Sequence, residues 1–271
     1  MTTAPRSEPA PTAPSSPPTA PSSPPDATRP YGADPAQVYD VRGPSPGSTA
    51  VSATVLVVHG GFWRAAYDRA HAEPEAQAFA DAGYTVAVAE YRRVGMPGGG
   101  VPGTLDDVRG VVTAVLADPD LPGPLVLVGH SAGGHLATWA AGQPWLTEGG
   151  RGAVAGVVSL AGVVDLGAAD RLHLGDDAAR TFVGSGPGSA AWTAADPMTV
   201  PPRVPVRLLW GADDDVVPTA VGDAYRAQAE AAGVDVTSEV IAGADHFALI
   251  DPTSPAFAHV LAAVQSLTPI P

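Results

Sequence analysis

Short apolar runs alternate with stretches of helical period along most of this chain, and the alternation predicts its fold. The apolar runs predict strands at residues 37–41, 52–58, 84–91, 125–128, 154–160, 205–210 and 235–241. The stretches with a period near 3.6 predict helices at residues 67–82, 104–117, 134–142, 219–232 and 255–267. Continuously apolar strands that alternate with helices are typical of a mostly parallel sheet buried on both faces. We therefore expect an α/β fold with a central sheet flanked by helices.

Two segments do not follow this alternation. Residues 162–202, after the strand that ends near Leu160, have no clear period and predict a small insertion over the sheet edge. Residues 1–30 are rich in Pro, Ser and Ala, and Pro11–Pro24 contains the heptad PTAPSSP twice. Such a segment buries too little apolar surface to offset the entropy lost on ordering, so we expect a disordered tail and one domain over residues 31–271. Recognition of the tail by a proline-binding module is the alternative.

Composition and charge exclude several classes of function. The chain has 14 Lys plus Arg, all of them Arg, against 28 Asp plus Glu, for a formal net charge of −14. An acidic surface argues against nucleic acid or an anionic membrane as a partner. The absence of Cys excludes disulfides, thiolate nucleophiles and Cys-ligated metals. No apolar run approaches the ~20 residues of a membrane span, and residues 1–30 lack the apolar core of a secretory signal, so we expect a cytoplasmic protein.

The strand at 125–128 leads into Gly129-His130-Ser131-Ala132-Gly133, which a helix follows. A Gly-x-Ser-x-Gly sequence between a strand and a helix is typical of a nucleophile elbow, a sharp turn that presents its serine. Gly129 and Gly133 leave room for the tight turn, and the serine oxygen then stands beside a helix N-terminus. The pattern makes Ser131 a candidate nucleophile.

A serine nucleophile needs a base and an acid that orients the base, and the loops after later strands offer both. His246, in a Gly- and Ala-rich loop after the last predicted strand, is the first candidate base, with His173 in reserve. Three candidate acids follow the preceding strand, Asp213, Asp214 and Asp215, and Asp165 is a further alternative. The residue pattern alone does not choose among the three. Because the carboxyl ends of parallel strands meet at one edge of a sheet, we expect these loops to lie together.

The loop after the strand at 52–58 has the sequence His59-Gly60-Gly61-Phe62-Trp63-Arg64. Glycines let backbone N–H groups approach a substrate, and such a loop supplies one donor of an oxyanion hole. The backbone N–H of Ala132, next after the nucleophile, supplies the other. Several aromatic side chains could wall the substrate pocket, and we select Trp63 and Trp192 as candidate substrate contacts.

Four sequence blocks together resemble the α/β-hydrolase superfamily: His59–Trp63, Gly129–Leu136, Asp214–Pro218 and Gly243–Phe247. The chain is most similar to the esterase and lipase branch with an HGG-type oxyanion loop, and the resemblance spans about residues 31–267. It implies Ser131 as nucleophile, Asp214 as acid and His246 as base. It also implies that Gly61, Phe62 and Ala132 donate to the oxyanion.

The resemblance implies a serine esterase that acts on small carboxylic esters, without metal or other cofactor, in a catalytic domain over residues 31–271. HGG-x-W also resembles the loop of kynurenine formamidases and of feruloyl-esterase-like hydrolases, so an arylformamidase is the main alternative. A single-domain peptidase and a catalytically silent binding protein are further alternatives. The superfamily's dienelactone hydrolases use a Cys nucleophile, which this chain lacks.

Overall fold

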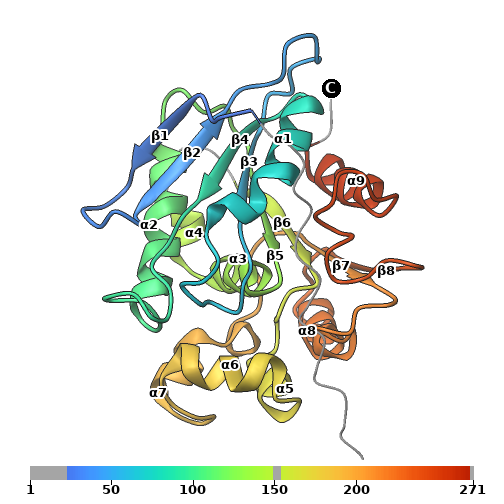
Figure 1. The fold of residues 1–271 in the computed structure, drawn as a ribbon. Helices are drawn as coiled ribbons and strands as arrows, with labels where there is room; N and C mark the ends of the chain where they lie inside the picture. Colours follow the sequence, from blue (N-terminus) through green and yellow to red (C-terminus); the bar gives the residue numbers. More distant parts are fainter. Residues whose placement is uncertain (1–22, 149–153, 269–271) are drawn as a thin grey trace, which may run out of the picture.

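The computed structural model describes residues 23–148 and 154–268, which form one central sheet covered by helices (Figure 1). The strands are β1 (Ala27–Pro30), β2 (Val38–Arg42), β3 (Thr54–Val58), β4 (Thr85–Ala89), β5 (Leu125–His130), β6 (Val154–Leu160), β7 (Val206–Gly211) and β8 (Val236–Ile241). In these ranges the sheet has eight strands in the order β1-β2-β4-β3-β5-β6-β7-β8. β1 pairs with β2 and β2 with β4 in antiparallel fashion, and the remaining pairs are parallel.

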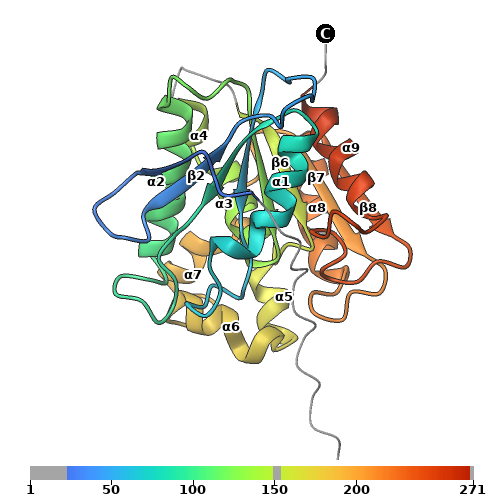
Figure 2. The same cartoon turned by 45° about the horizontal axis from the view of Figure 1, so that its top comes forward.

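Helices lie on both faces of this sheet. The helices of the described ranges, those of the insertion included, are η1 (Arg69–Ala72), α1 (Glu73–Asp81), α2 (Gly103–Ala117), α3 (Ala132–Gly142), α4 (Trp145–Glu148), α5 (Leu166–Arg171), α6 (Leu174–Val183), α7 (Ala190–Ala195), η2 (Pro197–Thr199), α8 (Ala220–Ala231) and α9 (Phe257–Leu267). One core cluster joins α2 and α3 to one face of the sheet, and a second joins α1 and α9 to the other (Figure 2). The α/β prediction is therefore confirmed. None of the helices in the described ranges is long and apolar enough to cross a bilayer.

The central strands are buried on both faces, which explains their continuous apolar sequences. Every residue of β3, β4 and β5 is buried. Strands covered by helices on both faces need apolar side chains at successive positions, not only at alternate ones. The outer strand β8 has four exposed residues among its six, so the burial of both faces is lost toward that edge.

The boundary of the tail needs a correction. Ala27–Pro30 was assigned to the disordered segment, but it forms the edge strand β1. The strand is held by ladder pairing to β2 and by ion pairs from Arg29 to Asp118 and Asp120. The ion pairs join residues about 90 positions apart, so the local composition did not show them. Residues 23–26 of the predicted tail are also described, and the Asp26 N–H donates to the Val41 carbonyl at 2.8 Å. Residues 1–22 lie outside the described residues.

The insertion after β6 lies beyond the carboxyl edge of the sheet. Its helices α5, α6 and α7 gather there as a cap, away from the sheet faces (Figure 1). The segment 173–177 within the cap contains four residues with left-handed backbone, His173, Gly175, Asp176 and Asp177. The carbonyl of Gly175 accepts a hydrogen bond from Arg64, which ties the cap to the loop after β3.

Candidate active site

The four loops that sequence analysis selected follow β3, β5, β7 and β8 and meet at the carboxyl edge of the sheet. Ser131 immediately follows β5, and Asp214 and His246 lie in the loops after β7 and β8. A pocket of about 60 Å³ opens at this edge. Its wall is made by Gly61, Phe62, Tyr67, His71, His130, Ser131, Val216, His246 and Phe247.

Ser131 sits in a strained backbone conformation, with φ 55° and ψ −116°. A Cβ at Gly129 would lie 2.2 Å from the carbonyl oxygen of Gly133, and one at Gly133 would lie 1.9 Å from that of Val58. Only glycine fits at either position. The Ser131 N–H donates to the carbonyl of Leu160 at 2.8 Å, which fixes the turn on β6. The surrounding structure holds an unfavourable conformation that exposes the side chain at the sheet edge.

His246 and Asp214 form a buried pair. The Nδ1 atom of His246 lies 2.8 Å from Oδ2 of Asp214, and their side chains are 3 % and 0 % exposed. The other oxygen, Oδ1, accepts from the N–H groups of Val216 and Val217 at 2.9 and 2.8 Å. Because Nδ1 is bonded to the carboxylate, Nε2 is left for the pocket, in the orientation that a general base needs.

The other candidate acids and the reserve base do not contact His246 or Asp214 in this way. Asp213 and Asp215 are exposed on the same loop. Asp165 caps α5 by accepting from the Ala168 N–H at 2.7 Å. The reserve base, His173, is exposed on the cap and bonds Asp177. Of the candidates weighed, the structure therefore brings only Asp214 and His246 together.

The HGGFW loop lies against the nucleophile turn. A Cβ at Gly60 would come within 2.9 Å of the His130 carbonyl and 3.2 Å of Ser131 Cβ, so the two turns touch through glycine. Gly61 and Phe62 have positive φ, 107° and 50°, as does the following residue. Within residues 23–148 and 154–268, no acceptor is recorded for the N–H groups of Gly61, Phe62 or Ala132. These donors are free for a ligand.

A buried polar cluster that the sequence analysis missed supports this loop. His59 bonds Glu90 at 3.2 Å, and Glu90 pairs with Arg93 at 2.7 Å. Tyr91 stacks on the His59 ring at 4.5 Å and donates to the His59 carbonyl at 2.7 Å. Burial alone would raise the pKa of Glu90, but the His59 hydrogen bond and the Arg93 charge outweigh it and lower that pKa. Nothing in the sequence around Glu90 pairs it with a residue 31 positions away.

The two tryptophans selected as substrate contacts lie in the core. Trp63 is 1 % exposed, stacks on Phe182 at 4.6 Å and donates its indole N–H to His135 Nδ1 at 3.2 Å. Trp192 is 5 % exposed and packs in the same cluster. Neither belongs to the pocket wall, so the structure does not bear out these two selections. The aromatic residues of the pocket wall are instead Phe62, Tyr67 and Phe247.

Two histidines that flank Ser131 are buried beside the site. His130 bonds the carbonyl oxygen of His246 through Nε2 at 2.9 Å, and burial holds its pKa well below the ordinary value. His135 bonds the Ala195 carbonyl, and burial lowers its pKa to about 4. Both rings are therefore neutral at neutral pH. They add no positive charge next to His246.

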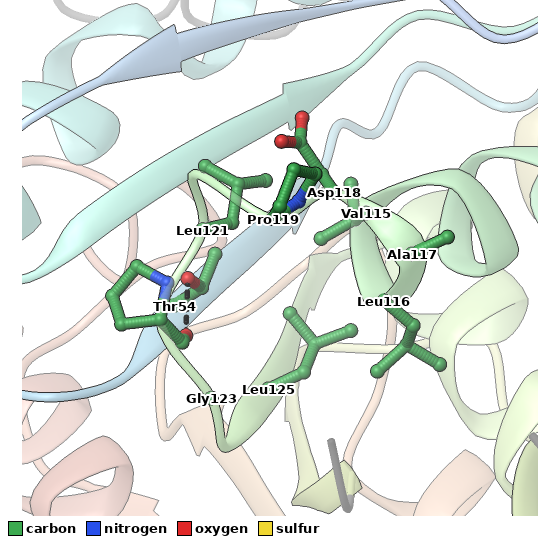
Figure 3. A pocket seen from close by; sticks show the side chains of 10 residues that line it. Thr54, Val115, Leu116, Ala117, Asp118, Pro119, Leu121, Gly123 and Leu125 are labelled. Carbon is green, nitrogen blue, oxygen red and sulfur yellow. Dashed lines mark hydrogen bonds between the residues drawn. The ribbon is translucent and has the colours of Figure 1, made fainter. Parts of the chain in front are cut away.

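A second depression, of about 190 Å³, lies at the opposite edge of the sheet (Figure 3). Thr54 and Leu125, the first residues of β3 and β5, form part of its wall, whereas Ser131 follows the last residue of β5. The Thr54 hydroxyl donates to the Pro122 carbonyl at 2.7 Å, and Asp118 pairs with Arg29. Its named polar groups are thus already partnered. The smaller pocket beside Ser131 holds the candidate catalytic residues Ser131 and His246.

The strand order and the serine on a strained turn after β5 are typical of the α/β-hydrolase fold, and the His–Asp pair lies in the loops after β8 and β7 where that fold carries its catalytic base and acid. The BD-FAE family model matches residues 39–228, and the chain belongs to this esterase-like family of α/β-hydrolases. The matched range includes Ser131 and Asp214 but ends before His246. The resemblance seen in the sequence is thereby confirmed. No significant match was found among curated protein sequences.

Solved structures of esterases have the same fold. A truncated carbohydrate esterase from gut microbiota has a TM-score of 0.72 at 19 % identity, over 90 % of this chain and 96 % of that one. Esterase B from Lactobacillus rhamnosis has a TM-score of 0.72 at 22 % identity, over 91 % and 87 %. The esterase Est2 from Thermogutta terrifontis has a TM-score of 0.69 at 20 % identity, over 90 % and 92 %. At these identities the likeness describes the fold.

Proposed function

We propose that this chain is a serine esterase that cleaves small carboxylic esters through an acyl-enzyme. The observation that carries the proposal is the buried His246–Asp214 pair beside Ser131, in a pocket whose wall includes both the serine and the histidine. Membership of an esterase-like family supports it.

In the proposed mechanism, Ser131 Oγ attacks the ester carbonyl carbon while His246 Nε2 takes the hydroxyl proton. Asp214 holds the imidazole by its Nδ1 atom and stabilises the imidazolium. The carbonyl electrons move onto the oxygen, where the N–H groups of Ala132 and Phe62, with Gly61 beside them, stabilise the charge. The carbonyl then re-forms, the bond to the alcohol oxygen breaks, and His246 returns the proton to that oxygen.

The second half of the cycle repeats these steps with water. Water gives a proton to His246 and attacks the acyl carbon, and the proton passes to Ser131 Oγ as the acid leaves. Each group therefore ends in its starting state, and no other reagent is consumed.

The size of the pocket supports a short acyl group. One water needs about 10–15 Å³ by the same measure, so about 60 Å³ holds only a few heavy atoms. The side chains of Phe62, Val216 and Phe247 make most of the wall apolar. We therefore expect acetyl to butyryl esters to react best.

The test is an assay of purified protein against p-nitrophenyl esters of two to twelve acyl carbons and against N-formylkynurenine. Ser131→Ala is the inactive control, and Ser266→Ala, on α9, is its matched control. We expect turnover of the short esters that Ser131→Ala abolishes and Ser266→Ala keeps. A strong preference for the formamide would make the chain an arylformamidase, and full activity of Ser131→Ala would refute the proposed nucleophile.

A further inference from the structure

Three polar side chains of the pocket wall, those of Tyr67, His71 and His130, have no part in the mechanism above. His71, in η1, belongs to the pocket wall, and neither of its ring nitrogens has a hydrogen-bond partner among the described residues. Burial, together with the neighbouring rings of His59 and His246, lowers its pKa to about 4. At neutral pH the ring is therefore neutral, with one N–H donor and one acceptor nitrogen.

The position of His71 within the pocket is fixed by its ring contacts. It lies parallel to within 24° of the His130 ring at 6.3 Å, and the His130 ring lies 4.5 Å from that of His246. Its edge faces Phe247, the residue after His246, at 6.2 Å. His71 therefore belongs to the part of the wall that is built around His246.

The location of His71 indicates which part of the substrate it contacts. In the proposed mechanism His246 Nε2 returns its proton to the alcohol oxygen, so this oxygen must lie beside His246. The atoms of the alcohol next to that oxygen then lie against the same part of the wall. They meet an imidazole with free hydrogen-bonding capacity.

Tyr67 extends this polar surface toward solvent. Its ring lies 6.2 Å from His71, at 77°, and its side chain is partly exposed. Its hydroxyl has no partner among the described residues. By contrast, His130 Nε2 is occupied by the His246 carbonyl, and His130 Nδ1, which has no partner among the described residues, is itself buried. The accessible polar groups without a partner that face an alcohol here are thus those of His71 and Tyr67.

We propose that His71, with Tyr67 beside it, is a subsite that hydrogen-bonds a hydroxyl group on the alcohol part of the ester. The preferred substrates are then short acyl esters of alcohols that carry a second hydroxyl, rather than esters of simple alkyl alcohols. A hydroxyl both donates and accepts, so it matches either tautomer of the neutral ring. This inference rests on the esterase function proposed above.

The test compares two esters of equal size, 2-hydroxyethyl butanoate and propyl butanoate, by pH-stat titration. The measured quantity is the ratio of their kcat/KM values, for the wild type and for His71→Phe, with the exposed cap residue His173→Phe as matched control. The intrinsic reactivity of the two esters is the same for every variant, so a change in ratio reports the contact alone. We expect His71→Phe to lower the ratio about 5- to 10-fold while the propyl ester rate stays within about 3-fold, and His173→Phe to leave the ratio unchanged.

A second measurement needs no variant. With p-nitrophenyl butanoate as acyl donor, added ethylene glycol or 1-propanol competes with water for the acyl-enzyme, and the alcohol enters through the same subsite. Glycol has two reactive hydroxyls and propanol one, so we expect glycol to capture clearly more than twice as much of the acyl group at equal concentration. Capture by glycol no more than twice that by propanol, or an equal ratio in wild type and His71→Phe, overturns the subsite and leaves the esterase standing. Failure of the wild type to hydrolyse any ester overturns the proposed function itself.

Discussion

Glu75 offers a sharp test of the electrostatics of this fold. It is a buried residue of α1, is 1 % exposed, and its Oε2 atom has no hydrogen-bond partner among the described residues. Burial raises its pKa from 4.5 to about 8, and no neighbouring charge contributes. The native protein therefore holds this carboxyl protonated at neutral pH.

The sign of the effect follows from proton binding. Below pH 4.5 the carboxyl is protonated in both the folded and the unfolded chain and makes no difference. Between pH 4.5 and about 8 the unfolded chain releases the proton and the folded chain keeps it, so stability falls by about 1.4 kcal/mol per pH unit. Above pH 8 the full cost, on the order of 5 kcal/mol, destabilises the folded state.

Glu75→Gln removes the proton equilibrium and keeps the shape of the side chain. We expect wild type and variant to unfold at similar temperatures near pH 4.5, and the variant to become more stable as pH rises toward 9. For a domain of this size, about 5 kcal/mol corresponds to a difference of roughly 10–20 °C in Tm.

The assay is calorimetric or circular-dichroism melting of both proteins at pH 4.5, 6, 7.5 and 9. Other titrating groups act equally in both proteins and cancel in the difference. Glu230→Gln, on the exposed surface of α8, is the control and should show a flat difference. A difference between wild type and Glu75→Gln that is the same at pH 4.5 and pH 9 would refute the reasoning.

Three further predictions concern the site and its support. Asp214→Asn should lower kcat for p-nitrophenyl butanoate about 10³–10⁴-fold, because Asp214 bonds His246. Asp213→Asn should stay within about 2-fold of the wild type, and equal losses in the two variants would contradict this assignment. Gly133→Ala should abolish soluble expression or lower Tm by more than 10 °C, because its Cβ would lie 1.9 Å from a carbonyl oxygen. The control Gly43→Ala, whose Cβ would meet its nearest atom at 3.6 Å, should have the Tm of the wild type. Trp63→Phe removes the donor to His135 Nδ1, so it should lower the free energy of unfolding in urea by about 1–3 kcal/mol and leave KM unchanged. A large rise in KM would show that Trp63 contacts the substrate after all.

The central strands and the nucleophile turn were predictable because their determinants are local. Residues 154–160 match β6 at both ends, since an apolar run covered on both faces has a pattern of its own. The glycines around Ser131 are required by contacts within the turn and with the strand beside it. Because parallel strands direct their following loops to one edge, the meeting of the Ser131, Asp214 and His246 loops could also be predicted.

The choice among neighbouring groups depended on the tertiary structure. The pattern left three adjacent aspartates open as partners of His246, and the resemblance pointed to Asp214. The fold turns Asp214 inward, where the N–H groups of Val216 and Val217 hold it. An aromatic residue at a sheet edge can wall a pocket or fill a core, and Trp63 fills the core because α3 and α6 meet it there.

The sequence by itself determined the α/β architecture, the elbow and the edge at which the candidate site lies, because each follows from residues close in the chain. The tertiary structure alone decided that Ala27–Pro30 joins the sheet, that Glu90 supports the HGGFW loop and that His71 faces the pocket with ring nitrogens that no described residue bonds. These features arise between elements far apart in sequence. Their energies depend on burial and on partners that no local pattern contains.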